Sequence, residues 1–284
     1  MSIPQTWSID CDVLLYAVGF VGQTTAVLDG EGQPFLNADG TPMRRDKPVL
    51  TLAPEQAQAQ LIQMLQRILT QSGGTVGELY LTGVDNFREH WAVEGYPYKG
   101  NRAGQDKPLL YNDLREFLIR DLGAIVVDGF EADDQLAYNA HHYGWGIATV
   151  DKDLLQVPGW HFNWLKKDPK PFQVSEVEGL RSFYLQLMSG DATDNIPGLK
   201  KMTGQIATAK LKKPIAEATS EEVMWKHVKS VWLDAYRKNG MCLDDAETVV
   251  DEWLVRIGTL LWMDINMEGL GWVPPDRRSN EEEA

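Results

Sequence analysis

Short apolar runs alternate along the first half of the chain with longer segments in which apolar residues recur every three or four positions. The short runs are typical of buried strands, and the longer segments are typical of amphipathic helices. Strands are predicted at residues 7–10, 78–82, 124–127 and 145–150, and helices at 11–20, 54–71, 109–122 and 135–140. Because strands that alternate with helices form parallel sheets, we expect an α/β fold with a mostly parallel sheet flanked by helices.

Two regions depart from this alternation. Asp29-Gly30-Glu31-Gly32 and Asp39-Gly40 lie between extended segments, which predicts a hairpin outside the sheet. Beyond residue 175 the apolar spacing is mainly helical. We therefore expect a core domain over 1–188, a helical region over 189–276 and an acidic tail over 277–284.

Acidic residues follow every predicted strand. In chain order they are Asp10, then Asp85, then Glu131, Asp133 and Asp134, and then Asp151 and Asp153. The carboxyl ends of parallel strands lie along one edge of the sheet, where such folds bind their ligands, so we expect these acids to converge. Two more acids, Asp191 and Asp194, follow a helix predicted from residue 175 to about 188.

Each of these acids also has a simpler explanation. Asp10 or Asp12 could cap the first helix, and an acid in the first turn of any helix is favoured by the helix dipole. Carboxylates packed this closely repel one another, however, and proteins gather them mainly where a cation or a proton offsets the repulsion. Four strand ends that all carry acids favour a cation site.

The chemistry of such a site follows from its ligands. Carboxylate oxygens without histidine or cysteine suit Mg²⁺ or Mn²⁺ rather than zinc, and the chain has no GxSxG motif for a serine nucleophile. Two such ions about 3.5–4 Å apart activate a water and stabilise the leaving oxygen of a phosphate ester. The acids therefore predict metal-assisted hydrolysis of a phosphate ester.

The formal net charge of −14 argues against a nucleic-acid-binding protein only if the acids are spread over the surface. Bound cations would cancel part of that charge, and local basic patches could still hold phosphates. Residues 91–107 interleave aromatic and basic side chains, which suits single-stranded nucleic acid, and the lysines of 199–214 suit duplex phosphates. The alternative for both segments is an ordinary solvated surface.

The cysteine count, the apolar runs and the N-terminal segment indicate the cellular compartment. Cys11 and Cys242 are too few for a disulfide framework or a zinc ligand set. No apolar run reaches membrane-spanning length, and the segment Met1–Gln5 lacks the features of a signal peptide. We therefore expect a cytoplasmic protein without a membrane partner.

Six motifs occur in a fixed order: Ile9-Asp10; Asp85-Asn86-Phe87-Arg88; Tyr98-Lys99-Gly100-Asn101-Arg102; Glu131-Ala132-Asp133-Asp134; Asp151-Lys152-Asp153; and Gly190-Asp191-Ala192-Thr193-Asp194-Asn195-Ile196-Pro197-Gly198. Each motif alone is weak, but their order and spacing are specific. Together they resemble the 5′-nuclease superfamily, most closely bacteriophage 5′–3′ exonucleases and flap endonucleases. The 5′-nuclease domain of bacterial DNA polymerase I is similar. The resemblance covers about residues 7–212.

The resemblance implies a PIN-like (resolvase-like) core, a helical arch at about 91–107 and a helix–three-turn–helix element that binds duplex DNA. It also implies two divalent-metal sites. Carried over to this sequence, the first comprises Asp10, Asp85, Glu131, Asp133 and Asp134, and the second comprises Asp153, Asp191 and Asp194 with a contribution from Asp151. Asp133 and Asp153 would be catalytic ligands, and Lys99 and Arg102 would position the scissile phosphate.

DNA contacts are implied at Arg88, Tyr98, Lys99, Arg102, Lys200, Lys201, Thr203 and Lys210, with Tyr98 stacking on a terminal base. The family's duplex-binding loop usually runs G-[VI]-x-G-[IV]-G and can cradle K⁺ or phosphate with its backbone. Here Lys201 and Thr203 stand where glycines are expected, so we expect an altered K⁺ cradle.

The resemblance implies a metal-dependent 5′–3′ exonuclease or flap endonuclease that leaves 5′-phosphate and 3′-hydroxyl ends. Its substrate would be DNA with 5′ ends, flaps or nicks. A monomer that works beside replication proteins, in phage DNA replication in the cytoplasm of a bacterial host, fits this activity. The alternatives are a PIN-type endoribonuclease and a catalytically silent DNA-binding relative.

Overall fold

The computed structural model describes residues 2–278 and contains a six-stranded sheet with the strand order β5-β4-β1-β6-β7-β8. The strands are β1 (Thr6–Asp10), β4 (Val76–Thr82), β5 (Ile125–Val127), β6 (Gly146–Ala148), β7 (Gly159–Phe162) and β8 (Phe172–Val174). All neighbours pair in parallel except β7 and β8. The mostly parallel α/β sheet predicted from the sequence is confirmed.

Helices cover both faces of the sheet because alternate side chains of each strand point to opposite faces. The helices α1 (Cys11–Val21), α2 (Pro54–Ser72) and α3 (Tyr111–Arg120) pack on the face that carries Ile9 and Leu81. The helix α4 (Ala132–Tyr143) packs on the opposite face, against Tyr80 and Ile147. With both faces covered, the carboxyl edge of the sheet is left as the place for a site.

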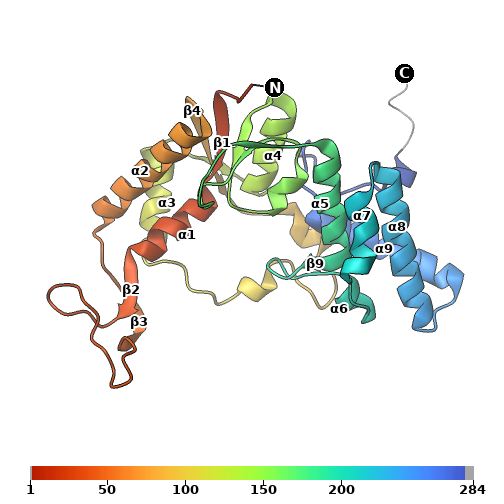
Figure 1. Ribbon diagram of the computed structural model, residues 1–284, viewed down its shortest axis with the longest axis horizontal. Coiled ribbons are helices and arrows are strands. Elements are labelled where there is room, and N and C mark those ends of the chain that lie inside the picture. Colours follow the sequence, from red (N-terminus) through yellow and green to blue (C-terminus); the bar gives the residue numbers. More distant parts are fainter. Residues whose placement is uncertain (1, 279–284) are drawn as a thin grey trace.

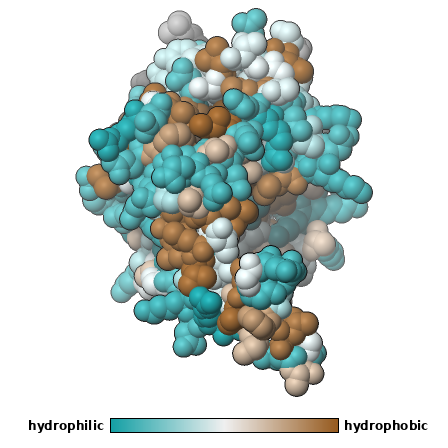
Figure 2. All heavy atoms as spheres, turned by 90° about the vertical axis from the view of Figure 1, so that its left-hand side faces the viewer, coloured by the Kyte–Doolittle hydropathy of each residue, from teal (hydrophilic) through white to brown (hydrophobic). Residues whose placement is uncertain are grey.

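The predicted hairpin is confirmed and forms a small sheet of its own. The strands β2 (Gln23–Ala26) and β3 (Arg44–Leu50) pair antiparallel, and the turn between them projects away from the body of the molecule (Figure 1). Figure 2 views the molecule from this side and shows apolar patches on its surface. Phe20, Phe35 and Leu36 are among the exposed apolar side chains here.

The helical region forms its own core beside the sheet. It comprises α6 (Leu199–Thr203), α7 (Ala209–Glu217), α8 (Glu221–Lys238) and α9 (Leu243–Leu261). The helix α5 (Glu176–Ser189), which falls within the expected core domain, packs with them. Their apolar faces gather around Phe183, Trp232 and Trp272. Two short strands, β9 (Gly190–Asp191) and β10 (Ile196–Pro197), connect α5 to α6. Most of the tail expected at 277–284 lies outside the described residues.

The segment expected to form a helical arch is the main departure from the predicted elements. Residues 91–107 contain no α-helix; one 3-10 turn ends at Trp91 and a second spans Gly100–Arg102. The glycines at 95, 100 and 104 and Pro97 explain the difference, because glycine disfavours a helix interior and proline interrupts its hydrogen bonds. In residues 2–278, no helix is long and apolar enough to cross a membrane.

Candidate functional site

A cavity of about 730 Å³ opens at the carboxyl edge of the sheet. The strands β1, β4, β5 and β6 all end beside it, and the 190–195 turn approaches from the helical region. Its acidic lining residues are Asp10, Asp12, Asp85, Glu89, Glu131, Asp133, Asp151, Asp153 and Asp194. The convergence expected from the strand ends is therefore observed for most of the predicted acids.

Asp10 both caps a helix and faces the cavity. Its Oδ1 accepts a hydrogen bond from the backbone N–H of Asp12 at 3.0 Å, and its Oδ2 accepts one from Thr149 Oγ1 at 2.9 Å. Burial, reinforced by the neighbouring Asp12 carboxylate, raises the pKa of Asp10 to about 7. Helix capping and a site role are thus compatible at this residue, because the two oxygens have different partners.

Asp133 lies in the first turn of α4 and points to the same side. Among the described residues we find no hydrogen-bond donor to its carboxylate. Burial raises the pKa of Asp133 well above its usual value, and the carboxylates of Asp10 and Asp151 raise it further. Lys99 offsets this only in part, so a bound cation would stabilise the charged carboxylate.

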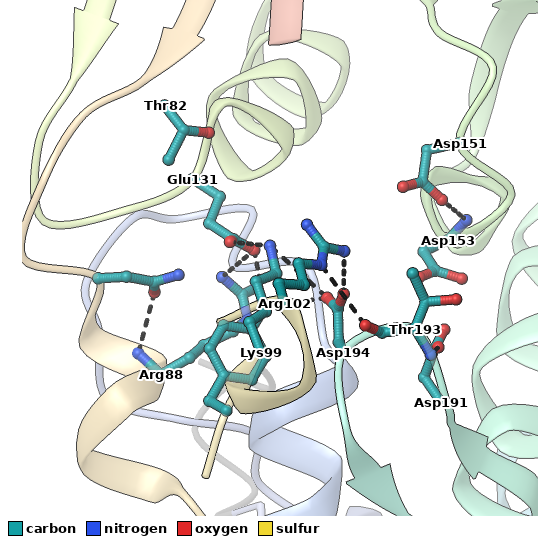
Figure 3. A network of polar contacts seen from close by, with 12 residues as sticks. Thr82, Arg88, Lys99, Arg102, Glu131, Asp151, Asp153, Asp191, Thr193 and Asp194 are labelled. Carbon is teal, nitrogen blue, oxygen red and sulfur yellow. Dashed lines mark hydrogen bonds and ion pairs between the residues drawn. The ribbon is translucent and has the colours of Figure 1, made fainter. Parts of the chain in front are cut away.

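A second group of carboxylates lies where the β6 end meets α5 and the 190–195 turn (Figure 3). Asp153 accepts a hydrogen bond from Gln186 Nε2, and its pKa is raised to about 7 by burial and then by Asp151 and Asp191. Asp191 accepts the backbone N–H of Thr193 at 2.6 Å with Oδ1, while its buried Oδ2 has no hydrogen-bond partner. The exposed Lys152 Nζ lies 3.7 Å from that oxygen, so a cation bound there would replace only a solvated ammonium group.

Basic side chains from residues 97–102 enter between the two groups (Figure 3). Lys99 Nζ contacts Glu131 Oε1 and lies 3.6 Å from Asp194 Oδ2, and Arg102 contacts Asp194 Oδ1. The Tyr98 hydroxyl donates to Glu131 at 2.8 Å. Although burial opposes ionisation of Glu131, the positive charges of Lys99 and Arg88 lower its pKa. The acids and bases singled out from separate motifs therefore form one network.

Asp134 and Arg88 do not occupy the places expected from the resemblance. Arg88 donates to both carboxylate oxygens of Asp134 at 2.6 Å, and both side chains are almost fully buried. Asp134 also accepts the backbone N–H groups of Glu131 and Asp264. Both oxygens of Asp134 therefore already have donors, and the guanidinium group of Arg88 is buried against them.

The remaining predicted residues lie farther out. Asp85 is exposed at the cavity lining and adopts a positive φ of 62°. Lys200, Lys201 and Lys210 are exposed on α6 and α7, which form a helix-turn-helix unit. Thr203 is half-buried, and its hydroxyl donates to the Leu199 carbonyl within α6.

Three further polar residues of the site were not singled out from the sequence. Thr149 holds Asp10, Gln186 holds Asp153, and the backbone N–H of Thr82 donates to Asp12 at 2.9 Å. Thr149 could have been noticed as the residue two positions before Asp151. Gln186 lies on a helix from another core, and no sequence pattern relates it to Asp153.

The donor set fits hard divalent cations. All of its ligand atoms are oxygens. Asp191 Oδ2 receives no hydrogen bond, although Lys152 Nζ lies 3.7 Å away, and the Asp133 carboxylate faces other acids that Lys99 offsets only in part. No three acidic, histidine or cysteine side chains within residues 2–278 already have the spacing of an ion site. Lys99 and Arg102 supply the positive charge between the carboxylates instead.

Comparison with known proteins identifies sequences that are similar to this chain. No family model matches the chain. The sequence is 31% identical to DNA polymerase I of Deinococcus radiodurans over 163 residues, and 30% identical to the thermostable DNA polymerase I of Thermus thermophilus over 190 residues. The alignments cover 53% and 63% of this chain but only 17% and 22% of those polymerases, so the chain spans about a fifth of their length.

Solved structures with a partly similar backbone have a lower sequence identity to this chain. The bacteriophage T5 D15 flap endonuclease, solved as a pseudo-enzyme-product complex with DNA and metal ions, is 15% identical with a TM-score of 0.46, covering 88% of this chain and 98% of that one. The catalytic core of Rad2 in complex with a DNA substrate is 15% identical with a TM-score of 0.49, covering 95% and 83%. Human GEN1 with Holliday junction DNA is 14% identical with a TM-score of 0.42, covering 89% and 61%.

The fold and the cavity define an α/β protein with a carboxylate-lined site at the carboxyl ends of parallel strands. Its sequence similarity to bacterial DNA polymerase I agrees with the ordered motifs that resemble the 5′-nuclease superfamily. The similarity to bacterial DNA polymerase I that the sequence motifs predicted is confirmed over these residues.

Proposed function

We propose that this protein is a divalent-metal-dependent 5′–3′ exonuclease and structure-specific flap endonuclease that hydrolyses DNA phosphodiester bonds. The observation that carries the proposal is the convergence of carboxylates from four strand ends and the 190–195 turn on one cavity, with Lys99 and Arg102 among them. Hydrolysis in this class leaves a 5′-phosphate and a 3′-hydroxyl. A role in phage DNA replication is part of the proposal.

The carboxylates divide into two groups that suit two Mg²⁺ or Mn²⁺ ions. Asp10, Asp85, Glu131 and Asp133 would hold one, and Asp151, Asp153, Asp191 and Asp194 would hold the other. Bound there, the ions would supply an activated water and stabilise the leaving oxygen. Asp134 does not belong to the ligand set, because Arg88 occupies both of its oxygens.

The chain's own basic residues would orient the substrate. Lys99 and Arg102 reach the carboxylates from the cavity side, so the same side chains can hold a phosphate that lies against the acids. Lys200, Lys201 and Lys210 on α6 and α7 would bind the duplex through its phosphates, without reading its sequence. A K⁺ ion at the α6–α7 turn and a monomeric state beside replication proteins stay predictions.

The test is a cleavage assay with 5′-labelled flap, nicked, blunt and single-stranded DNA, and with a matched RNA, in MgCl₂ and in MnCl₂. We expect cleavage of the flap and of 5′ ends, and loss of cleavage with EDTA. Preference for the RNA would favour a PIN-type ribonuclease. DNA binding without cleavage in either metal would favour a silent relative and refute the proposal.

A further inference from the structure

Residues 97–102, which we call the strap, lie against the turn formed by residues 192–195. Hydrogen bonds from backbone and asparagine amides to backbone carbonyls join them: Lys99 N to Asp194 O at 2.9 Å, Asn101 Nδ2 to Ala192 O at 2.8 Å and to Thr193 O at 3.2 Å, and Asn195 Nδ2 to Pro97 O at 3.0 Å. None of these bonds uses a carboxylate of the cavity. The strap therefore has an attachment separate from its charged contacts.

The charged side chains of the strap occupy carboxylates assigned above to metal ions. Lys99 contacts Glu131 from the first group and lies 3.6 Å from Asp194 of the second. Arg102 contacts the other oxygen of Asp194. A carboxylate oxygen that already pairs with an ammonium or guanidinium group must give up that contact before it can ligate an ion.

The backbone of the strap and of the turn is held away from its relaxed geometry. Lys99 has a φ of 53° and Asn195 a φ of 60°, and both values lie in the left-handed region that L-residues seldom adopt. Lysine has no local hydrogen bond that favours this conformation, whereas asparagine tolerates it. The contacts around Lys99 therefore hold a conformation that the residue would leave if they were released.

We propose that the strap is an autoinhibitory contact, which closes the metal site by seating Lys99 and Arg102 on its carboxylates and opens when Mg²⁺ displaces them. The inference rests on the proposed function, because it takes these carboxylates to be metal ligands. Metal binding and strap release are then linked, so whatever weakens the strap tightens Mg²⁺ and whatever binds Mg²⁺ loosens the strap. Opened in this way, Lys99 and Arg102 become free to contact a phosphate.

The attachment through Asn101 and Asn195 allows the linkage to be tested without touching a charged residue. The double variant Asn101→Ala/Asn195→Gly removes the three asparagine hydrogen bonds to the strap and turn, while glycine keeps the positive φ at 195. The apparent affinity for an ion is proportional to the fraction of molecules in which the strap is open, so we expect the variant to bind Mg²⁺ about fivefold more tightly. Asn37→Ala, which removes a hydrogen bond to Thr41 in the distant hairpin, is the matched control.

The measurement uses full-length protein without DNA, so that it does not depend on turnover. Hydrogen exchange of peptides covering 97–104 is followed in EDTA and along a MgCl₂ titration, and calorimetry gives the Mg²⁺ dissociation constant. We expect slow exchange in EDTA, roughly fivefold faster exchange in the double variant, and faster exchange in the wild type once Mg²⁺ binds. The control variant should match the wild type in both measurements.

Exchange that stays unchanged or slows with Mg²⁺ would refute the autoinhibitory role of the strap. A double variant with unchanged Mg²⁺ affinity would refute it as well. These results are separable from a failure of the proposed function. Mg²⁺ binding and flap cleavage with an unresponsive strap would refute the strap alone. Absence of both Mg²⁺ binding and cleavage would refute the proposed function and the strap together.

Discussion

Two ion pairs involve the first residues of α4 and its N-cap, and solvent reaches only one of them. Arg88 and Asp134 are 1% and 0% exposed and form a bidentate pair, whereas the side chain of Lys99 opposite Glu131 is 27% exposed at the cavity. The buried pair receives extra hydrogen bonds from backbone groups, and the open pair faces other carboxylates. One acidic motif therefore provides both a permanent anchor and an exchangeable contact, with Asp133 between them.

The largest expected effect separates Asp133 from Asp134. Asp133→Asn should lower flap cleavage by roughly 10³- to 10⁴-fold, because charge stabilisation by a bound metal is worth several kcal/mol. It should leave the fold intact, since the Asp133 carboxylate is opposed by neighbouring acids. Single-turnover cleavage at saturating MgCl₂ and circular dichroism are the measurements. Wild-type turnover in this variant would count directly against the site.

Breaking the buried pair should act on stability instead. Arg88→Met leaves the Asp134 carboxylate buried without its counter-charge, and we expect a loss of about 3–5 kcal/mol in the free energy of unfolding. Lys99→Met is the matched control and should cost less than about 1 kcal/mol, because its pair is partly solvated. Urea denaturation measures both. Equal losses would show that the two pairs do not differ as described.

Kinetic measurements can test the role of Lys99, the basic member of the exchangeable pair. If Lys99 holds the scissile phosphate, Lys99→Met should slow the chemical step about 100-fold while the dissociation constant for duplex DNA changes less than about twofold. Rapid-quench cleavage and fluorescence anisotropy measure the two quantities. Equal losses in both would reduce Lys99 to an ordinary phosphate contact.

The smallest expected effect lies outside both pairs, on α6. Lys200→Ala and Lys201→Ala should each weaken duplex binding a few-fold and lower the slope of log affinity against log salt by about 0.9, as expected for one lost phosphate contact. Lys170→Ala removes an exposed lysine that pairs with Asp168, so it serves as the control. Salt titrations of DNA binding decide the matter. A slope as steep as that of the wild type would remove α6 from the duplex contact.

The parts of this molecule that local patterns determine were predictable. Asp10, Glu131 and Asp151 follow strands, and because those strands are parallel their ends meet at one edge. Which of two adjacent helical acids faces the cavity was not predictable, because Asp133 and Asp134 differ by about 100° around the helix. The deciding partner of Asp134 is Arg88, 46 positions away.

In residues 91–107, which include the strap, the local sequence was a better guide to the structure than the resemblance. The resemblance predicted a helical arch at 91–107, but glycines and Pro97 favour turns, and the structure has only 3-10 turns there. Gln186 was missed for another reason, since its partner Asp153 lies across the boundary between two apolar cores. A contact between two separate apolar cores produces no regular spacing of residues from which it could be predicted.

The hydrogen bond from Arg88 to the carbonyl of Trp262 joins residues 174 positions apart. A ribosome adds about 5–20 residues per second, so roughly 10–35 seconds pass between synthesis of the arginine and synthesis of its last acceptor. Until then the anchor beneath the acidic edge is incomplete, and the sheet emerges with a guanidinium group that is only partly satisfied. In a cell, the acidic edge would therefore be among the last features of this chain to become rigid.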